Sequence, residues 1–215
     1  CSEALFEDEG FAERELAALV ASKVFFHLGE LGDALTYALG AGKLFDVREK
    51  TEFSVTLIAK CIDQYVGLCN EAAAKGAEPE IDGRLVDIVE SMVNTCLADG
   101  QFEQVVGLAL EARRLDKLLI ALEKCTDVNK LLQYSLKVAQ THVHSRQFRH
   151  KVLDTLVQEF LKQESPDYIS ISQCILFLDE PDKVTEIFLK LLKGSDDDVL
   201  LAYQVALDLA ETQHQ

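Results

Sequence analysis

The most constraining feature of this sequence is the recurrence, from one end to the other, of apolar residues at every third or fourth position. This spacing places apolar side chains on one face of an α-helix. The clearest stripes are Ile58, Cys61, Ile62, Tyr65, Leu68, Cys69 and Ala72; Leu85, Ile88, Val89, Met92, Val93 and Cys96; Val128, Leu131, Leu132, Leu136 and Ala139; Leu153, Leu156, Val157, Phe160 and Leu161; and Val184, Ile187, Phe188, Leu191 and Leu192. No comparable alternating run of β-branched residues predicts a strand. The sequence therefore predicts an all-α fold.

Proline and glycine fall where short connections between helices are expected. Ser165-Pro166 and Glu180-Pro181 place two prolines at the first position of a helix, where the missing N–H has no cost. The third proline lies in the polar stretch from Lys75 to Asp82, the longest predicted loop. Asp99-Gly100 and Gly194-Ser195 are typical of turns. We expect roughly ten helices joined by short loops.

The first long helix, predicted from about Glu13 to Leu28, is apolar on more than one side. One face carries Leu16, Leu19 and Val20, and a neighbouring face carries Ala17, Ala21, Val24, Phe25 and Leu28. A helix with so wide an apolar surface needs more than one neighbour to cover it. The middle layer of a stacked array provides such neighbours.

An internal repeat supports stacking. Residues 29–44 align without gaps on residues 100–115, at an offset of about two ~34-residue tetratricopeptide-like hairpins. Gly29 and Gly100 can adopt the left-handed conformation that ends a helix. The matched apolar positions include alanines, which are small enough to let two helices approach closely. These positions are Ala34, Leu35, Ala38 and Leu39 in the first copy and Val105, Val106, Ala109 and Leu110 in the second. The repeat predicts a rod-like α-solenoid of stacked antiparallel helical hairpins, with residues 1–215 forming a single domain.

Charge and hydropathy argue against nucleic-acid and membrane partners. The formal net charge of −16 repels phosphate backbones and anionic membranes. Two small basic patches, Arg113-Arg114 and Arg146 to Lys151, are interpreted as solvated helix ends or salt-bridge partners. No signal peptide is visible, and no run of about 18 apolar residues could span a bilayer. Because the chain begins at Cys1 and has one methionine, Met92, we expect a fragment of a longer protein of the cytoplasm or nucleus.

Cysteine and histidine provide the nearest approach to reactive chemistry. The six cysteines form no C-x-x-C pair, and most fall on apolar helical faces, so we expect small buried residues in a reducing compartment. Core packing of Cys61 and Cys69 is favoured over redox pairing. His142 and His144 would lie about 200° apart on a helix, so surface or capping roles are favoured over a metal site that includes them and His150.

The remaining motifs also predict no catalytic residue, cofactor or metal. Gly40-Ala41-Gly42 follows a predicted helix, whereas phosphate-binding loops follow strands. The acidic clusters Glu7-Asp8-Glu9 and Asp196-Asp197-Asp198 lack the ligand spacing of an EF-hand, and we interpret them as favourable charge near helix N-termini. Without a convergent set of reactive groups, the sequence predicts a protein that is not an enzyme.

Several stretches, in order along the chain, resemble the proteasome/cyclosome-repeat family of scaffold subunits of the proteasome regulatory particle. The stretches are Glu7 to Val47, Ile58 to Asp63, Ala109 to Asp116, Tyr134 to Val138, Gln147 to Leu153, Gln173 to Pro181 and Leu200 to Gln204. The resemblance implies a non-catalytic segment of the rod-like helical arm in the base of that particle. It implies ATPase-ring, lid and ubiquitin-receptor subunits as partners, reached mostly through parts outside this chain. The stretch from Asn70 to Gly83 departs from the family's pattern.

Two other classes of function remain open at this point. A free-standing tetratricopeptide-like adaptor would bind short peptides in a concave groove, which usually presents clustered basic or asparagine side chains; the sequence identifies no such cluster. An all-helical enzyme would need a metal or cofactor, for which the sequence predicts no ligands. The scaffold segment is therefore the favoured interpretation.

Overall fold

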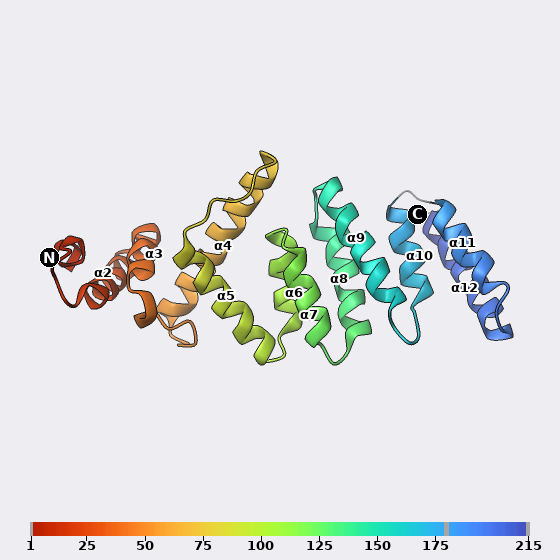
Figure 1. The fold of residues 1–215 in the computed structure, drawn as a ribbon, viewed down its shortest axis with the longest axis horizontal. Coiled ribbons are helices and arrows are strands. Elements are labelled where there is room, and N and C mark those ends of the chain that lie inside the picture. Colours follow the sequence, from red (N-terminus) through yellow and green to blue (C-terminus); the bar gives the residue numbers. More distant parts are fainter. Residues whose placement is uncertain (1, 179–180, 214–215) are drawn as a thin grey trace. The chain divides into compact units, whose positions relative to one another are not determined.

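The computed structural model describes residues 2–178 and 181–213, and every regular element in these ranges is a helix (Figure 1). The α-helices are α1 (Ser2–Glu7), α2 (Arg14–Leu28), α3 (Leu31–Gly40), α4 (Glu52–Ala74), α5 (Gly83–Ala98), α6 (Phe102–Glu111), α7 (Leu115–Lys124), α8 (Val128–His142), α9 (Arg146–Leu161), α10 (Tyr168–Phe177), α11 (Pro181–Leu191) and α12 (Asp196–Gln213), with a short 3₁₀ helix η1 (Gly42–Leu44) after α3. The all-α prediction is confirmed. The chain divides into two compact units, Cys1–Gln101 and Phe102–Gln215, and the prediction of a single domain stays a prediction.

In the first unit, helices that follow one another in sequence pack together: α1 on α2, α2 on α3, α3 on α4, and α4 on α5. Small residues allow α2 and α3 to approach closely, since Ala18, Ala34 and Ala38 have no exposed surface. The buried Ser22 hydroxyl donates a hydrogen bond of 2.6 Å to the Ala34 carbonyl across this contact. The predicted close packing of small residues is confirmed.

The surface of α2 is covered less completely than the sequence predicts. Ala17, Ala18 and Ala21 are buried, but a stripe of four larger residues remains 48 to 68% exposed within the described chain. These residues are Leu16, Val20, Val24 and Leu28. The side of α2 that carries alanine and serine permits the closest approach of other helices, so it becomes the packed side.

In the second unit, each helix again packs on helices one or two positions away in sequence. The contacts run through α6 with α7 and α8, α8 with α9, α9 with α10, and α10 with α11 and α12. Leu132, Leu156, Phe160 and Ile171 are fully buried between these layers. Burial of each such side chain stabilises the fold by roughly 1.5–3 kcal/mol. Such sequential packing is that of an α-solenoid, while the rod-like shape of the whole chain stays a prediction.

The internal repeat is confirmed by the backbone. Gly29 and Gly100 have positive φ angles of 83° and 73°. After Gly29, the Glu30 N–H donates to the Phe25 carbonyl at 3.0 Å, and after Gly100 the Gln101 N–H donates to Cys96 at 2.8 Å. These are the bonds of a Schellman motif, which satisfies carbonyls at a helix end. All eight matched apolar positions of α3 and α6 are buried.

Side chains at helix N-termini explain where several helices begin. Thr51, Asp82, Ser145 and Asp167 accept hydrogen bonds from backbone N–H groups in the first turns of α4, α5, α9 and α10, which satisfies otherwise unpaired donors. Pro181 begins α11, as predicted. The prediction for Pro166 is wrong: α10 begins at Tyr168 because the Asp167 carboxylate caps the helix there.

Candidate functional site

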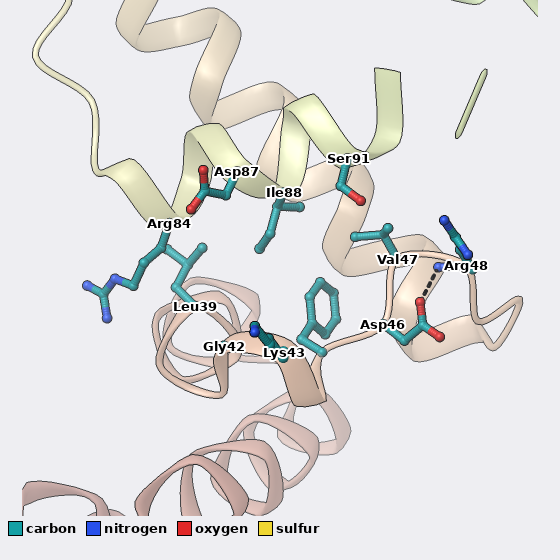
Figure 2. A pocket seen from close by; sticks show the side chains of 11 residues that line it. Leu39, Gly42, Lys43, Asp46, Val47, Arg48, Arg84, Asp87, Ile88 and Ser91 are labelled. Atoms are coloured by element: carbon teal, nitrogen blue, oxygen red, sulfur yellow. Dashed lines mark hydrogen bonds between the residues drawn. The ribbon is translucent and has the colours of Figure 1, made fainter. Parts of the chain in front are cut away.

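A cleft of about 770 Å³ lies in the first unit, between α3, η1, the segment after η1, and α5. Its lining comprises Leu39, Gly42, Lys43, Phe45, Asp46, Val47, Arg48, Arg84, Asp87, Ile88 and Ser91. Figure 2 shows Ile88 pointing from α5 into the opening, with Leu39 across from it. The cleft combines an apolar interior with charged side chains at its edge.

One wall is a single face of α5. Arg84, Asp87, Ile88 and Ser91 follow the spacing i, i+3, i+4 and i+7, which places their side chains on one side of a helix. A neighbouring face carries Leu85, Val89, Val93 and Cys96, all buried, and α5 packs on α4. The α4 contact therefore fixes the direction in which the cleft-facing residues of α5 point.

The start of this wall is held by Asp82, the N-cap of α5. The Asp82 carboxylate accepts a hydrogen bond of 2.9 Å from the Arg84 backbone N–H, and it forms an ion pair of 2.7 Å with the Arg84 guanidinium. Hydrogen bonds from Arg84 lower the pKa of Asp82, and the same contact raises the pKa of Arg84. Both side chains are about half exposed, so the pair orients Arg84 more than it stabilises the fold.

The opposite wall is built from the turn that follows η1. Phe45 is buried, and its ring packs edge-on against Phe53 of α4, with centroids 6.0 Å apart. The Asp46 carboxylate accepts a hydrogen bond of 2.9 Å from the Arg48 backbone N–H (Figure 2), an arrangement that stabilises a tight turn. The turn therefore has both an aromatic anchor and a local hydrogen bond.

The three histidines considered in the sequence are exposed and lie at the junction of α8 and α9. His142 is the last residue of α8, His144 lies in the connection, and His150 is in α9. The ring Nδ1 of His142 is 2.6 Å from the Thr141 hydroxyl. The described residues contain no group of three His, Cys, Asp or Glu side chains placed to hold a metal ion. The prediction that the chain has no metal site stays a prediction.

His142 also borders a smaller hollow of about 160 Å³ in the second unit. The other lining residues are Gly107, Leu110, Glu111, Tyr134 and Val138. The polar side chains of this hollow are one carboxylate, one phenol and one imidazole, those of Glu111, Tyr134 and His142.

Four of the cysteines are buried, as predicted: Cys61, Cys69, Cys96 and Cys174. Burial raises the pKa of the Cys61 thiol to about 11, and burial together with the Asp167 charge raises that of Cys174 to about 12. Both thiols are therefore protonated at neutral pH and poor nucleophiles. Cys125 is half-buried at the end of α7, and Cys1 lies outside the described residues.

The charged clusters fall partly where the sequence predicts. Asp196-Asp197-Asp198 opens α12, as expected. The prediction for Glu7-Asp8-Glu9 is wrong, because Glu7 ends the short helix α1 and Asp8 turns the chain by accepting a hydrogen bond from the Gly10 N–H. Arg114 forms a two-bond ion pair with Asp116, at 2.7 and 2.8 Å, and Arg146 to Lys151 begins α9. Both basic patches have the local roles expected of them.

The sequence alone does not indicate the cleft. Of its basic residues, Lys43 and Arg48 lie in one short segment, whereas Arg84 lies far from both in sequence. One signal was present: Arg84, Asp87 and Ser91 make a polar stripe beside the apolar face of α5. The partner wall depends on how the turn after η1 folds against α4, which periodicity does not predict.

No helix in the described ranges combines the length and the apolar character needed to cross a membrane.

Comparison with known proteins gives a consistent result over the full chain. Residues 2–215 match the family model described as "26S proteasome subunit RPN2, N-terminal domain". The chain is 50% identical over 216 residues to the 26S proteasome non-ATPase regulatory subunit 1 homolog B of Arabidopsis thaliana, covering 99% of this chain and 22% of that protein.

Similar relatives occur in an insect and a yeast. The 26S proteasome non-ATPase regulatory subunit 1 of Drosophila melanogaster is 45% identical, covering 99% of this chain and 21% of that protein. The 26S proteasome regulatory subunit rpn2 of Schizosaccharomyces pombe is 38% identical, covering 99% of this chain and 22% of that protein. The chain thus spans about a fifth of the length of the curated relatives that it matches.

Proposed function

The chain belongs to the family of N-terminal domains of the 26S proteasome subunit RPN2, and on this premise we propose that it is a non-catalytic scaffold segment in the base of the proteasome regulatory particle. Its role is to support assembly and the docking of other subunits for ubiquitin-dependent protein degradation. The observation that carries the proposal is the family match over residues 2–215. The relatives are named regulatory subunits, which favours the scaffold over a free-standing adaptor.

The physical support comes from sequential packing. Because each helix packs mainly on its neighbours in sequence, the outer helix faces remain available to other proteins. The partners proposed are the ATPase ring, the lid and, mostly through parts outside this chain, ubiquitin receptors. The proposed compartments are the cytoplasm and the nucleus, and neither nucleic acid nor a membrane is proposed as a partner.

Affinity purification of the full-length protein tests this role. We expect the tagged protein to recover ATPase-ring and lid subunits in near-stoichiometric amounts. Deletion of residues 1–215 should reduce the recovery of subunits that dock on this segment, while circular dichroism verifies that the remainder stays folded. Recovery of the full-length protein without these subunits contradicts the proposal.

A further inference from the structure

The cleft between η1 and α5 is a local exception to the charge of the chain. The molecule carries a formal net charge of −16, yet the cleft presents three cations, Lys43, Arg48 and Arg84, and two carboxylates, Asp46 and Asp87. An acidic surface elsewhere repels acidic partners, so a cationic edge favours their binding at one place.

Two of these cations have no competing partner among the residues that the structure describes. Arg84 already shares its charge with Asp82. In residues 2–178 and 181–213, neither the Lys43 ammonium nor the Arg48 side chain forms a hydrogen bond or an ion pair, and both residues are exposed. Binding of carboxylates at these two positions therefore requires no internal ion pair to break.

The interior of the cleft offers apolar surface between the charges. Phe45 and Leu39 are buried, while Val47 and Ile88 are half-buried and accessible from the opening. Figure 2 places Arg84 at one end of the cleft and Arg48 at the other, with Ile88 and Lys43 between them. An arrangement with arginines at both ends, and with Lys43 and the apolar Ile88 between them, fits an extended chain better than a compact ligand.

The cleft is also largely preformed. The aromatic contact between Phe45 and Phe53 holds one wall, and the packing of α5 on α4 holds the other. A binding surface that is fixed before binding loses little conformational entropy when the ligand arrives.

We propose that this cleft binds an extended acidic segment of another regulatory-particle subunit. A bulky apolar side chain of the segment packs against Val47 and Ile88, and its carboxylates pair with Lys43 and Arg48. The inference rests on the proposed scaffold function and adds a docking surface and the chemistry of its occupant.

Photo-cross-linking in the assembled regulatory particle tests the inference. A benzophenone amino acid replaces Ser91, an exposed cleft residue, in the full-length protein; the control position is Gln64, an exposed residue of α4 outside the cleft lining. After purification of the particle and irradiation, mass spectrometry identifies the segment cross-linked at each position. We expect position 91, and not position 64, to capture an acidic segment with a bulky apolar residue.

A charge-reversal pair makes the test specific. The double variant Lys43→Glu and Arg48→Glu should lower the cross-linking yield at position 91 by about tenfold, which corresponds to a loss of about 1.4 kcal/mol of binding free energy. The matched control, Lys60→Glu with Lys75→Glu, makes the same change of charge on exposed lysines of the same unit outside the cleft lining and should leave the yield unchanged. Equal thermal unfolding temperatures of the two double variants exclude misfolding as the cause.

The outcomes separate the two proposals. A particle that assembles without a cross-link at position 91, with a cross-link to a basic or neutral segment, or with a yield insensitive to Lys43→Glu and Arg48→Glu overturns the cleft inference and leaves the scaffold function standing. Failure of the unmodified protein to enter the particle overturns the scaffold function and the inference with it.

Discussion

At the scale of single residues, Ser22 and Ser172 are both fully buried but differ in hydrogen bonding. The Ser22 hydroxyl donates to the Ala34 carbonyl. In the part of the chain that the structure describes, the Ser172 hydroxyl is the buried side-chain polar atom without a partner. A buried hydroxyl loses its hydrogen bonds to water on folding, and only a partner inside the protein offsets that loss.

Alanine substitution should therefore have opposite effects at the two serines. We expect Ser172→Ala to increase the free energy of unfolding by about 1 kcal/mol, because it removes an unsatisfied group. We expect Ser22→Ala to decrease it by about 1 kcal/mol, because it removes a satisfied buried hydrogen bond. Urea unfolding of both variants, with unchanged m-values, provides the measurement. A loss of stability in Ser172→Ala would show that its hydroxyl has a partner after all.

The sequence could predict the burial of these residues but not their hydrogen bonds. Ser172 lies between Ile171 and Cys174 on the apolar side of α10, and all three are buried. Whether a hydroxyl finds an acceptor depends on which carbonyl of a neighbouring helix comes within reach. That depends on the register of helix packing, about which the periodicity of one helix carries no information.

At the scale of elements, the turns that end α2 and α5 require glycine for a backbone reason. Gly100 has a φ of 73°, a conformation that costs an L-residue with a side chain about 1–2 kcal/mol. Gly67 lies inside α4, where an added methyl group would meet no atom within 4 Å. The two positions thus separate the backbone role of glycine from its effect on helix propensity.

We expect Gly100→Ala to destabilise the protein by about 1 kcal/mol and Gly67→Ala to stabilise it by about 0.5–1 kcal/mol. In the first case alanine is forced into the left-handed region. In the second it lowers the conformational entropy of the unfolded chain and favours the helix. Denaturant midpoints of the two variants, compared with the parent, give the result; shifts of the same sign would refute the assigned role of Gly100.

The repeat shows how far element-level prediction extends. Gly29 and Gly100 were recognisable because glycine is the expected residue at a helix end with positive φ. Gly42 and Arg113 are also matched by the repeat, and their φ angles are 55° and 57°, but an arginine gives no such signal. The second copy of the repeat thus keeps the positive φ angle of Gly42 at Arg113, although it has no glycine there. The sequence also gives no signal for α1. This helix has only 6 residues, which is too short for a periodic apolar stripe.

At the scale of the whole molecule, packing within each unit follows the order of the sequence. Among the described residues, the helix pairs in extensive contact are separated by at most two positions along the chain. A globular bundle of similar size would also bring together helices distant in sequence. Local packing of this kind is characteristic of repeat proteins, in which each hairpin contacts its immediate neighbours.

This local packing, together with the repeat of residues 29–44 at 100–115, predicts an extended chain. A compact globule of 215 residues has a radius of gyration of about 17 Å, whereas hairpins stacked in one dimension separate the ends of the molecule and give a larger value. Small-angle X-ray scattering of residues 1–215 should therefore yield a radius clearly above the globular value. Light scattering on the same sample must give the mass of one chain, since a dimer would also raise the radius. A monomer at the globular value would contradict the solenoid and favour a closed helical bundle.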